Sequence, residues 1–329
     1  MIRFPSIEQY YKAIKTIQKA CQKQEVPVPQ SMIFQGTVKL HGTNAGVGYD
    51  VETGSIWAQS RSKVIVPGEK DNCGFAAFVE ENKKVFEEMF VSLPEDGRCC
   101  IFGEWCGEKI QKGVAINSLP RMFVIFAVGA ITNGPDGPEY RWLSANKCNH
   151  LESPENRIFN IHSFPKWEVE IDCTRPELAV PELERITHEV ETLCPVGAAL
   201  GVKGVGEGVV WEARDSDIGV VRFKTKGEKH RATNRKSSAP VDVEQLASID
   251  AFLEYAVTEN RLQQGLEQVF QSNGEEPHPK GMGAFISWVV KDVFKEESDT
   301  LESNKLADSR KEVSKQIATK ARGWLLTKV

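Results

Sequence analysis

The side chains best suited to chemistry in this sequence lie in five short segments. In chain order these segments hold Lys39, Arg61, Glu104, Glu207 and the pair Lys224 and Lys226. A lysine amine becomes a nucleophile only after it loses its proton, which requires burial or neighbouring cations that lower its pKa. Together, the residue types predict a cleft in which cations hold a phosphate beside a lysine nucleophile.

The first segment reads Lys39-Leu40-His41-Gly42-Thr43-Asn44 and lies at the end of a strand predicted over residues 34–40. Gly42 lets the backbone approach a phosphate closely, because glycine has no Cβ atom. A surface lysine before a Gly-Thr-Asn turn gives the same pattern. The segment therefore acquires a functional meaning only together with the other four.

Each glutamate accompanies an apolar strand. Glu104 stands between Gly103 and Trp105, and Glu207 opens the run Gly208-Val209-Val210-Trp211. Burying a carboxylate among apolar residues is costly unless a hydrogen bond or a cation compensates it. These glutamates therefore indicate cation partners, while an edge-strand glutamate that faces water is the structural alternative for Glu104.

Lys224 and Lys226 are two residues apart on a predicted strand, so their side chains point to the same face. Two cations on one face of a cleft would hold a phosphate and lower the pKa of a nearby lysine. Lysines that protect an exposed edge strand give the same pattern. Arg61 follows a predicted strand and on its own is typical of a solvated arginine.

In this order the five segments resemble the covalent nucleotidyltransferase superfamily of ATP-dependent ligases and capping enzymes. Histidine at position 41, before Gly42, is similar specifically to the RNA ligase 2 family, which holds the phage duplex-RNA ligase and the kinetoplastid RNA-editing ligases. The resemblance covers nearly the whole chain. Further matches are Pro5-Ser6-Ile7-Glu8, Phe102-Gly103-Glu104, Ile110-Gln111-Lys112, Glu207-Gly208 and Lys224-x-Lys226.

The resemblance implies a ligase that uses ATP as co-substrate and Mg²⁺ or Mn²⁺. Lys39 would attack the α-phosphate to give a lysyl-AMP, the AMP would pass to an RNA 5′-phosphate, and a 3′-OH would displace it to seal the strand, most readily at a nick in duplex RNA. The implied partner is thus RNA with 3′-OH and 5′-phosphate ends.

The resemblance also assigns roles to the site residues. Lys224 and Lys226 would stabilise charge on the α-phosphate in the transition state. The other expected roles are ribose binding by Arg61 and Glu104, metal binding through water by Glu207, adenine stacking by Phe126, and later steps by His41 and Asn44.

The sequence departs from the family pattern at three places. Val38 replaces an acidic residue before the nucleophile, so adenine recognition there would be backbone-mediated. Ala127 follows the stacking Phe126 where the family commonly has aspartate. Residues 227–230 read Gly-Glu-Lys-His instead of an Asn-Ser pair.

Periodicity predicts the elements that position these residues. The first predicted element is a helix from Pro5-Ser6 through Cys21. A β-rich region follows, with strands predicted over 34–40, 45–49, 56–60, 99–105, 122–131, 208–214 and 219–225. Between these strands the pattern predicts a helix over 75–90, and acidic helix with turns over 166–200. The polar, basic stretch 226–238 reads as a linker. Apolar stripes at spacings of three and four then predict helices.

The fold class is therefore α+β. We expect a nucleotidyltransferase domain over 1–238, with ATP-grasp-like antiparallel sheets and helices, and a small all-helical, RNA-end-binding domain over 239–329. The basic residues Lys229, Arg231, Arg235 and Lys236 are the candidate RNA contacts, because such residues bind phosphates without reading sequence.

Composition narrows the partners and the compartment. The net charge of −5 argues against non-specific nucleic-acid binding over the whole surface. Eight cysteines without Cys-x-x-Cys pairs, no signal peptide and no membrane-length apolar run predict a protein of the cytoplasm, or of the host cytoplasm if it is viral, with reduced thiols and no membrane partner. We expect a monomer.

Two other functions stay open from the sequence. A DNA ligase is the alternative within the enzyme class, although nothing after Lys226 resembles the OB-fold and terminal basic motif expected in DNA ligases and capping enzymes. A non-sealing adenylate- or RNA-binding protein of the same fold is the alternative outside it, against which the retained Lys39 argues, since a binding module needs no nucleophile. A purely structural interaction protein fits these residues least.

Overall fold

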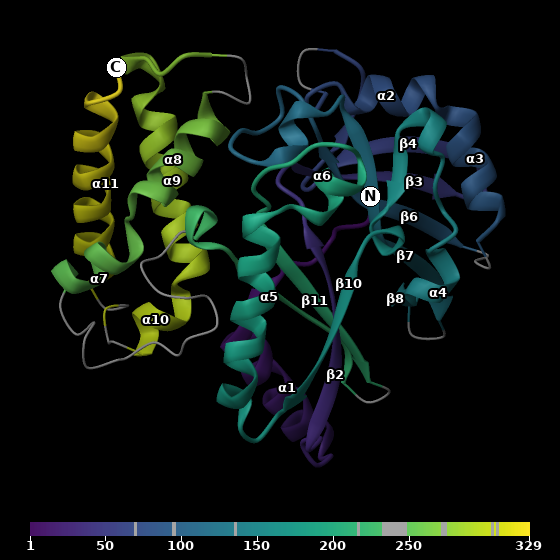
Figure 1. Cartoon of the computed structure of the whole chain (residues 1–329), viewed down its shortest axis with the longest axis horizontal. Helices are drawn as coiled ribbons and strands as arrows, with labels where there is room; N and C mark the ends of the chain where they lie inside the picture. The colour runs from purple at the N-terminus through teal and green to yellow at the C-terminus, as the bar shows by residue number, and fades with distance from the viewer. Residues whose placement is uncertain are drawn as a thin grey trace.

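The structure is a computed structural model that describes residues 1–68, 71–93, 97–134, 137–215, 218–231, 249–270, 275–303, 306 and 309–329. Two β-sheets with flanking helices form one part of the molecule, and a group of helices forms the other (Figure 1). This is the mixed α+β architecture, with a helical C-terminal region, that the sequence predicts. The predicted domain boundary at 238/239 lies outside the described residues.

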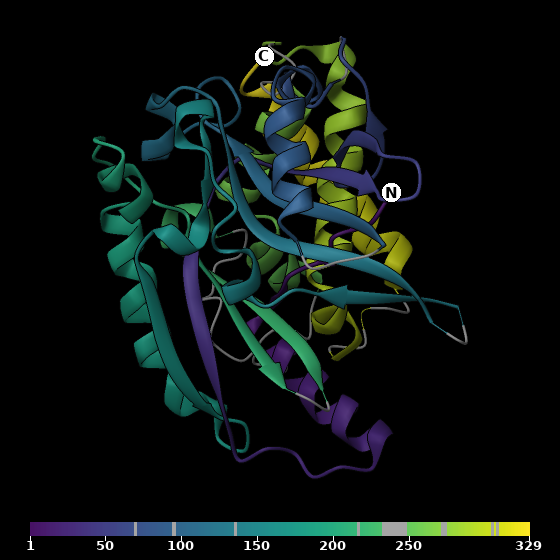
Figure 2. The ribbon, with the colours of Figure 1, turned by 90° about the vertical axis from the view of Figure 1, so that its right-hand side faces the viewer.

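The first sheet carries most of the candidate site. Its strand order is β1 (Glu8–Gln9), β12 (Gly219–Lys226), β11 (Gly208–Asp215), β2 (Ser31–Lys39) and β10 (Lys166–Asp172), antiparallel except for β1 with β12. Apolar side chains of one face pack against α1 (Tyr10–Gln24) and α5 (Val180–Thr192). The alternation along β2 leaves its other face polar. Figure 2 shows the twisted sheet with both helices.

The second sheet supplies the opposite wall of the site. Its order is β5 (Val64–Ile65), β4 (Ser55–Ser60), β3 (Thr43–Asp50), β6 (Arg98–Cys106), β7 (Met122–Gly134) and β8 (Gly137–Trp142), with β9 (Ile158–Asn160) parallel to β7. Helices α2 (Phe75–Glu81) and α3 (Lys83–Val91) cover its outer face. Shorter elements complete this part: α4 (Ala145–Cys148), α6 (Pro195–Ala199) and the 3₁₀ turns Ala115–Ser118, Pro154–Asn156, Ile161–Ser163, Pro176–Ala179 and Glu228–His230.

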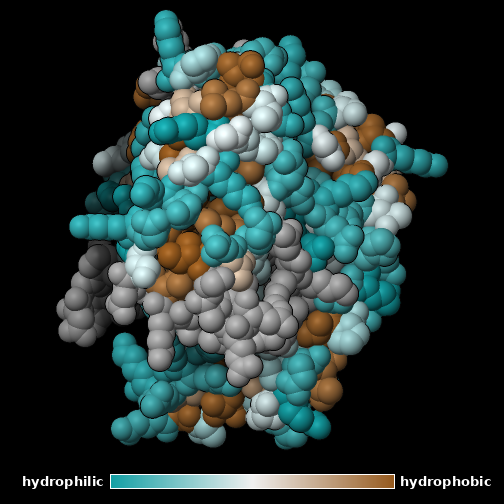
Figure 3. Space-filling model, turned by 90° about the vertical axis from the view of Figure 1, so that its left-hand side faces the viewer, coloured by the Kyte–Doolittle hydropathy of each residue, from teal (hydrophilic) through white to brown (hydrophobic). Residues whose placement is uncertain are grey.

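The C-terminal region has a hydrophobic core of its own, centred on fully buried residues such as Phe252, Phe285 and Ile317. The helices are α7 (Ile249–Ala256), α8 (Glu259–Val269), α9 (Met282–Glu296), α10 (Ser298–Ser303) and α11 (Arg310–Leu326), with a 3₁₀ turn at Pro279–Gly281. Figure 3 shows the side of the molecule on which this helical domain lies, where hydrophilic residues surround small hydrophobic groups. Among the described helices, none combines the length and the apolar character needed to cross a membrane.

The predicted strands are confirmed to within a few residues, and the C-terminal region is helical as its apolar stripes predict, but three predictions were wrong in part. The first helix begins at Tyr10, because residues before it run along the sheets, with Ile2 and Phe4 buried there. The helix predicted over 75–90 is interrupted at Asn82. The region 166–200 contains strand β10, in which Val169 and Ile171 are buried between exposed glutamates.

Candidate active site

Lys39, Glu207 and Lys226 form one compact ion cluster. Lys39 ends β2 and Lys226 ends β12, and both pair with Gly208 at the start of the strand between them. The Lys39 Nζ donates a hydrogen bond to Glu207 Oε2 at 2.6 Å, and the Lys226 Nζ lies 3.0 Å from Glu207 Oε1. Glu207 is 2% exposed. The sheet register thus places one buried carboxylate between two ammonium groups.

Burial dominates the electrostatics of this cluster. It lowers the pKa of Lys39, and Lys226 adds to that effect while Glu207 opposes it. Burial would raise the pKa of Glu207, but Lys39 and Lys226 outweigh it and hold this pKa well below its usual range. Lys39 is therefore a lysine whose proton is more easily lost than usual, beside a carboxylate that stays ionised.

Glycines let the backbone adopt the shape that this cluster needs. At Gly42 a Cβ atom would lie 2.4 Å from the Trp105 carbonyl oxygen. At Gly208, where φ is +154°, a Cβ atom would lie 2.1 Å from the Thr225 carbonyl oxygen. Both distances are shorter than real contacts, so a larger residue at position 42 would push the turn after Lys39 away from β6, and one at position 208 would push the start of β11 away from the end of β12 that carries Lys226.

Glu104 and Gln111 hold the turn that follows Lys39. The Gly42 amide donates to Glu104 Oε1 at 3.0 Å, and Gln111 Nε2 donates to the Gly42 carbonyl oxygen at 3.3 Å. Burial raises the pKa of Glu104 to about 7, with Lys39 opposing the shift. Because β6 lies between β3 and β7, the edge-strand alternative for Glu104 is excluded. Gln111 belongs to the family match Ile110-Gln111-Lys112, and its hydrogen bond to Gly42 indicates that it holds the turn after Lys39 in place.

A β-bulge directs Phe126 toward the space between the sheets. Ile125 pairs with Gly103 and Ala127 pairs with Phe102, so Phe126 is the extra residue on β7. It is only partly buried, it lines the cleft, and its ring meets Phe4 edge-on with centroids 5.0 Å apart. The bulge gives Phe126 an accessible ring in place of the core position that alternation alone would allow.

The cleft itself is a cavity of about 740 Å³ between the polar face of the first sheet, the second sheet and the helical domain. Arg61 lines it and donates to Ser6 Oγ at 3.2 Å, while Asn44 lines it from β3. Lys224 lines it from β12. The Val38 side chain is 3% exposed and packs in the core on the far side of β2, so only its backbone faces the site.

Two histidines meet beside Glu207. The His41 Nδ1 lies 3.5 Å from Glu207 Oε2, its Nε2 lies 3.7 Å from Glu267 Oε2, and its ring packs edge-on against His230. Burial lowers the pKa of His41, but Glu207 and Glu267 outweigh burial and raise it to about 9. His41 therefore adds a cation to the cluster at neutral pH.

His230 was not predicted as a site residue. It is 8% exposed, and its Nδ1 has no hydrogen-bond partner among the described residues. The turn that holds it is fixed by the Gly227 amide, which donates to the Glu207 carbonyl oxygen, and by the Lys229 amide, which donates to Glu191 Oε1. The only signal in the sequence was the departure from the family pattern at 227–230.

Burial of His230 predicts acid sensitivity. Burial lowers its pKa to about 4, so between pH 6.5 and 4 the unfolded chain binds a proton that the folded chain does not. We expect the free energy of unfolding to fall by about 2–3 kcal/mol across this range on account of His230. Urea unfolding of His230→Asn should show a smaller slope with pH than the same substitution at the exposed His188. Equal slopes in the two variants would contradict the prediction.

The predicted RNA contacts are only partly accessible. Lys229 is exposed, whereas the Arg231 side chain is 15% exposed and pairs with Glu228 at 3.2 Å. Arg235 and Lys236 lie outside the described residues. The helical domain contributes acidic residues that the sequence analysis did not select, namely Glu267 beside His41 and Glu296 beside Lys224.

The donor chemistry at Glu207 fits one kind of metal ion. Among the described residues, no group of three or more histidine, cysteine or acidic side chains is arranged to hold a metal. Glu207 lines the cleft, and its two carboxylate oxygens contact Lys39 and Lys226. A magnesium-like ion that keeps most of its water and binds substrate phosphates needs few protein ligands. Glu207 could hold such an ion through water.

A family model described as RNA ligase matches residues 32–226, which contain the candidate site residues of the two sheets. The N-terminal segment, residues 227–231 and the C-terminal helices lie outside the match. A search of curated proteins finds no significant match.

Several solved structures of a Naegleria gruberi RNA ligase are similar. The complex with PPi shares 16% identity at a TM-score of 0.44, over 68% of this chain and 55% of that one. A mutant with ATP and Mn shares 16% identity at a TM-score of 0.46, over 69% and 56%. This chain therefore spans little more than half the length of that ligase.

Proposed function

The chain belongs to the RNA ligase family of the covalent nucleotidyltransferase superfamily, and we propose that it is an ATP-dependent ligase that joins RNA 3′-OH and 5′-phosphate ends through a lysyl-AMP, with nicks in duplex RNA as the preferred substrate. The observation that carries the proposal is the Lys39–Glu207–Lys226 cluster, in which an amine whose pKa is lowered by burial lines a cleft of about 740 Å³.

In the proposed first step, the neutral Lys39 amine attacks the α-phosphorus of ATP. A P–N bond forms, the bond between the α-phosphorus and the bridging oxygen breaks, and pyrophosphate leaves with that oxygen. The proton lost from Lys39 passes to solvent in the cleft, because Glu207, whose pKa is held low, is a poor final acceptor. The hydrogen bond to Glu207 aims the amine during the attack.

Lys224 and Lys226 stand beside the nucleophile on one face of β12. Their ammonium groups would interact most strongly with the α-phosphate when its charge is highest, in the transition state. A magnesium or manganese ion bound through water near Glu207 would screen the phosphates. Phe126, Arg61 and Glu104 all line the cleft. In the proposed complex Phe126 would stack on adenine, and Arg61 and Glu104 would bind the ribose hydroxyls.

The later steps use the same cleft. The RNA 5′-phosphate attacks the lysyl-AMP phosphorus and displaces Lys39, and the RNA 3′-OH then attacks the 5′-phosphorus and releases AMP. His41 and Asn44 face the cleft at the end of β2 and the start of β3, where an RNA end would approach Lys39. Lys229 is the exposed cation closest in sequence to the paired lysines and is a candidate for phosphate contact.

The test has two stages. With radiolabelled ATP and magnesium, the protein should acquire a covalent AMP label that acid releases, as expected of a P–N bond. Pre-formed adduct should then seal a nicked duplex faster when the strand with the 3′-OH is RNA than when it is DNA.

Other outcomes would change the conclusion. Equal or faster sealing with DNA favours the DNA ligase alternative. An adduct that never leads to joining favours a non-sealing adenylate-binding protein. The absence of any adduct contradicts the proposal.

A further inference from the structure

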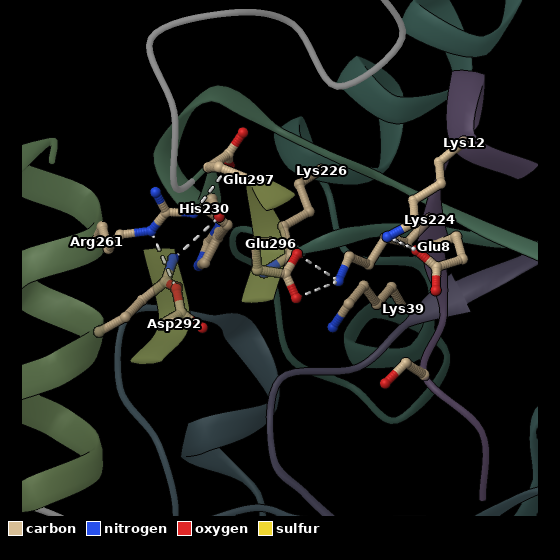
Figure 4. Close-up of polar contacts among 12 residues, drawn as sticks. Glu8, Lys12, Lys39, Lys224, Lys226, His230, Arg261, Asp292, Glu296 and Glu297 are labelled. Atoms are coloured by element: carbon tan, nitrogen blue, oxygen red, sulfur yellow. Dashed lines mark hydrogen bonds and ion pairs between the residues drawn. The ribbon is translucent and has the colours of Figure 1, made fainter. Parts of the chain in front are cut away.

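The helical domain reaches into the cleft with acidic side chains. Glu267 of α8 and Asp292 and Glu296 of α9 all line the cavity that contains Lys39. Glu296 points from the end of α9 toward β12 (Figure 4). ATP and RNA are polyanions, so carboxylates in this cleft would repel them and would not help them to bind. The acidic side chains must therefore have a role other than substrate binding.

Glu296 contacts a lysine of the cleft directly. The Lys224 Nζ donates to both of its carboxylate oxygens, at 3.1 and 3.3 Å, and both side chains are mostly buried, with 17% and 22% exposed. Burial would raise the pKa of Glu296, but Lys224 and Lys226 outweigh it and lower it to about 2. Two oxygens on one ammonium group are what a phosphate would also offer Lys224.

The position of the Glu296 carboxylate depends on how helices α8 and α9 pack. Next to it, the fully buried Arg261 of α8 pairs with Asp292 of α9 at 3.0 Å and with Glu297, the residue that follows α9, at 3.1 Å. Helix α8 also contacts the turn after β12. Asn260 Nδ2 donates to the Glu228 carbonyl oxygen, and Gln264 Nε2 donates to the His230 carbonyl oxygen. Moving Glu296 far from Lys224 therefore means moving α8 and α9 together.

We propose that the Glu296–Lys224 pair is an autoinhibitory contact, in which a carboxylate of the helical domain takes the place of a substrate phosphate at Lys224. The inference rests on the proposed function. In this closed arrangement Lys224 is neutralised, and ATP or an RNA phosphate must displace Glu296 to use it. A phosphate and the Glu296 carboxylate compete for the one ammonium group of Lys224. Binding of a phosphate is therefore coupled to release of the helical domain from the cleft.

The first test is the nearly isosteric Glu296→Gln, assayed by the initial rate of adduct formation at a series of ATP concentrations. We expect the ATP concentration for half-maximal rate to fall by about threefold to tenfold, as loss of a mostly buried ion pair predicts. Glu302→Gln, which removes an exposed acid of the same domain, is the control and should match the unaltered protein. An unchanged or higher half-maximal concentration in Glu296→Gln would overturn the proposal.

A second test restrains the domain without touching the acidic contact. Cysteines introduced by Glu228→Cys and Asn260→Cys stand where the α8 side chain meets the turn, and their disulfide would hold α8 against β12. The oxidised protein should need several times more ATP than its reduced form, and dithiothreitol should reverse the effect. Each single cysteine variant should not respond. A cross-linked protein that labels normally would overturn the proposal.

The two hypotheses fail in different ways. If the unaltered protein forms no adduct, the ligase function itself is wrong. If it forms the adduct but Glu296→Gln and the disulfide leave its ATP dependence unchanged, only the autoinhibitory contact is wrong.

Discussion

Lys39→Arg is expected to reduce covalent AMP labelling by at least about a thousandfold, because a guanidinium keeps the charge but cannot act as the nucleophile. The substitution retains a cation for Glu207, which is 2% exposed and accepts a hydrogen bond from Lys39 at 2.6 Å. The fold should therefore survive the change, and the thermal unfolding midpoint should stay within a few degrees. Gel labelling with radioactive ATP, under conditions that saturate the unaltered protein, measures the loss.

Two further variants make the result specific. Lys39→Ala should lose the label to the same extent but also lose stability, because it removes one of the two lysines that compensate the buried Glu207. Lys63→Arg changes an exposed lysine outside the cluster and should label normally. Labelling that persists in Lys39→Arg would mean that another residue carries the AMP, and the proposed mechanism would have to be abandoned.

The first sheet was predictable because its chemistry and its alternation agree. Lys39, Lys224 and Lys226 each follow the period of two that buries Val38, Phe223 and Thr225 on the opposite face. The alternation in the sequence is enough to place the three lysines on one side of their strands, even when the pairing of the strands is unknown. What it could not supply is the register, which sets Lys39 and Lys226 opposite the same residue, Gly208.

Phe126 shows a different limit. Its position in an apolar run is compatible with a core strand and with a cleft, and the decision depends on a bulge opposite Phe102 and Gly103. A bulge adds one residue to one strand and leaves no reliable mark in the sequence. The accessible ring is a property of how β6 and β7 pair, and it appears only once both strands are in place.

The contacts between the domains were beyond prediction for a physical reason. Glu296 and Lys224 are 72 residues apart, and Glu267 meets His41 from another helix of the same domain. On an isolated helix, each acidic residue looks like part of a solvated face. Only the placement of α8 beside the turn after β12, and of the end of α9 beside Lys224, turns them into site residues. His230 belongs to the same group, because its burial depends on the turn that Glu191 and Glu207 fix.

Arg261→Met is expected to destabilise the helical domain by about 3–5 kcal/mol, since it leaves a buried carboxylate without its partner. Arg261 is fully buried, and its guanidinium contacts Asp292 and also Glu297, which is 1% exposed. Methionine conserves much of the volume, so the loss reports charge rather than a cavity. Urea unfolding measures the total effect, and hydrogen exchange of the α8 and α9 amides locates it.

Two further measurements distinguish the loss of charge from the loss of packing in Arg261→Met. Burial raises the pKa of Glu297 and Arg261 counteracts this, so without Arg261 the carboxyl takes up a proton more readily. The penalty of Arg261→Met should therefore shrink as the pH falls from 8 to 5, because a neutral carboxyl is cheaper to bury than a charged one. The double variant Arg261→Met with Glu297→Leu should recover most of the lost stability, because it removes the uncompensated charge along with its former partner. If the double variant is as unstable as the single one at both pH values, packing and not charge is what Arg261 provides, and α8 and α9 are then held by the apolar core alone.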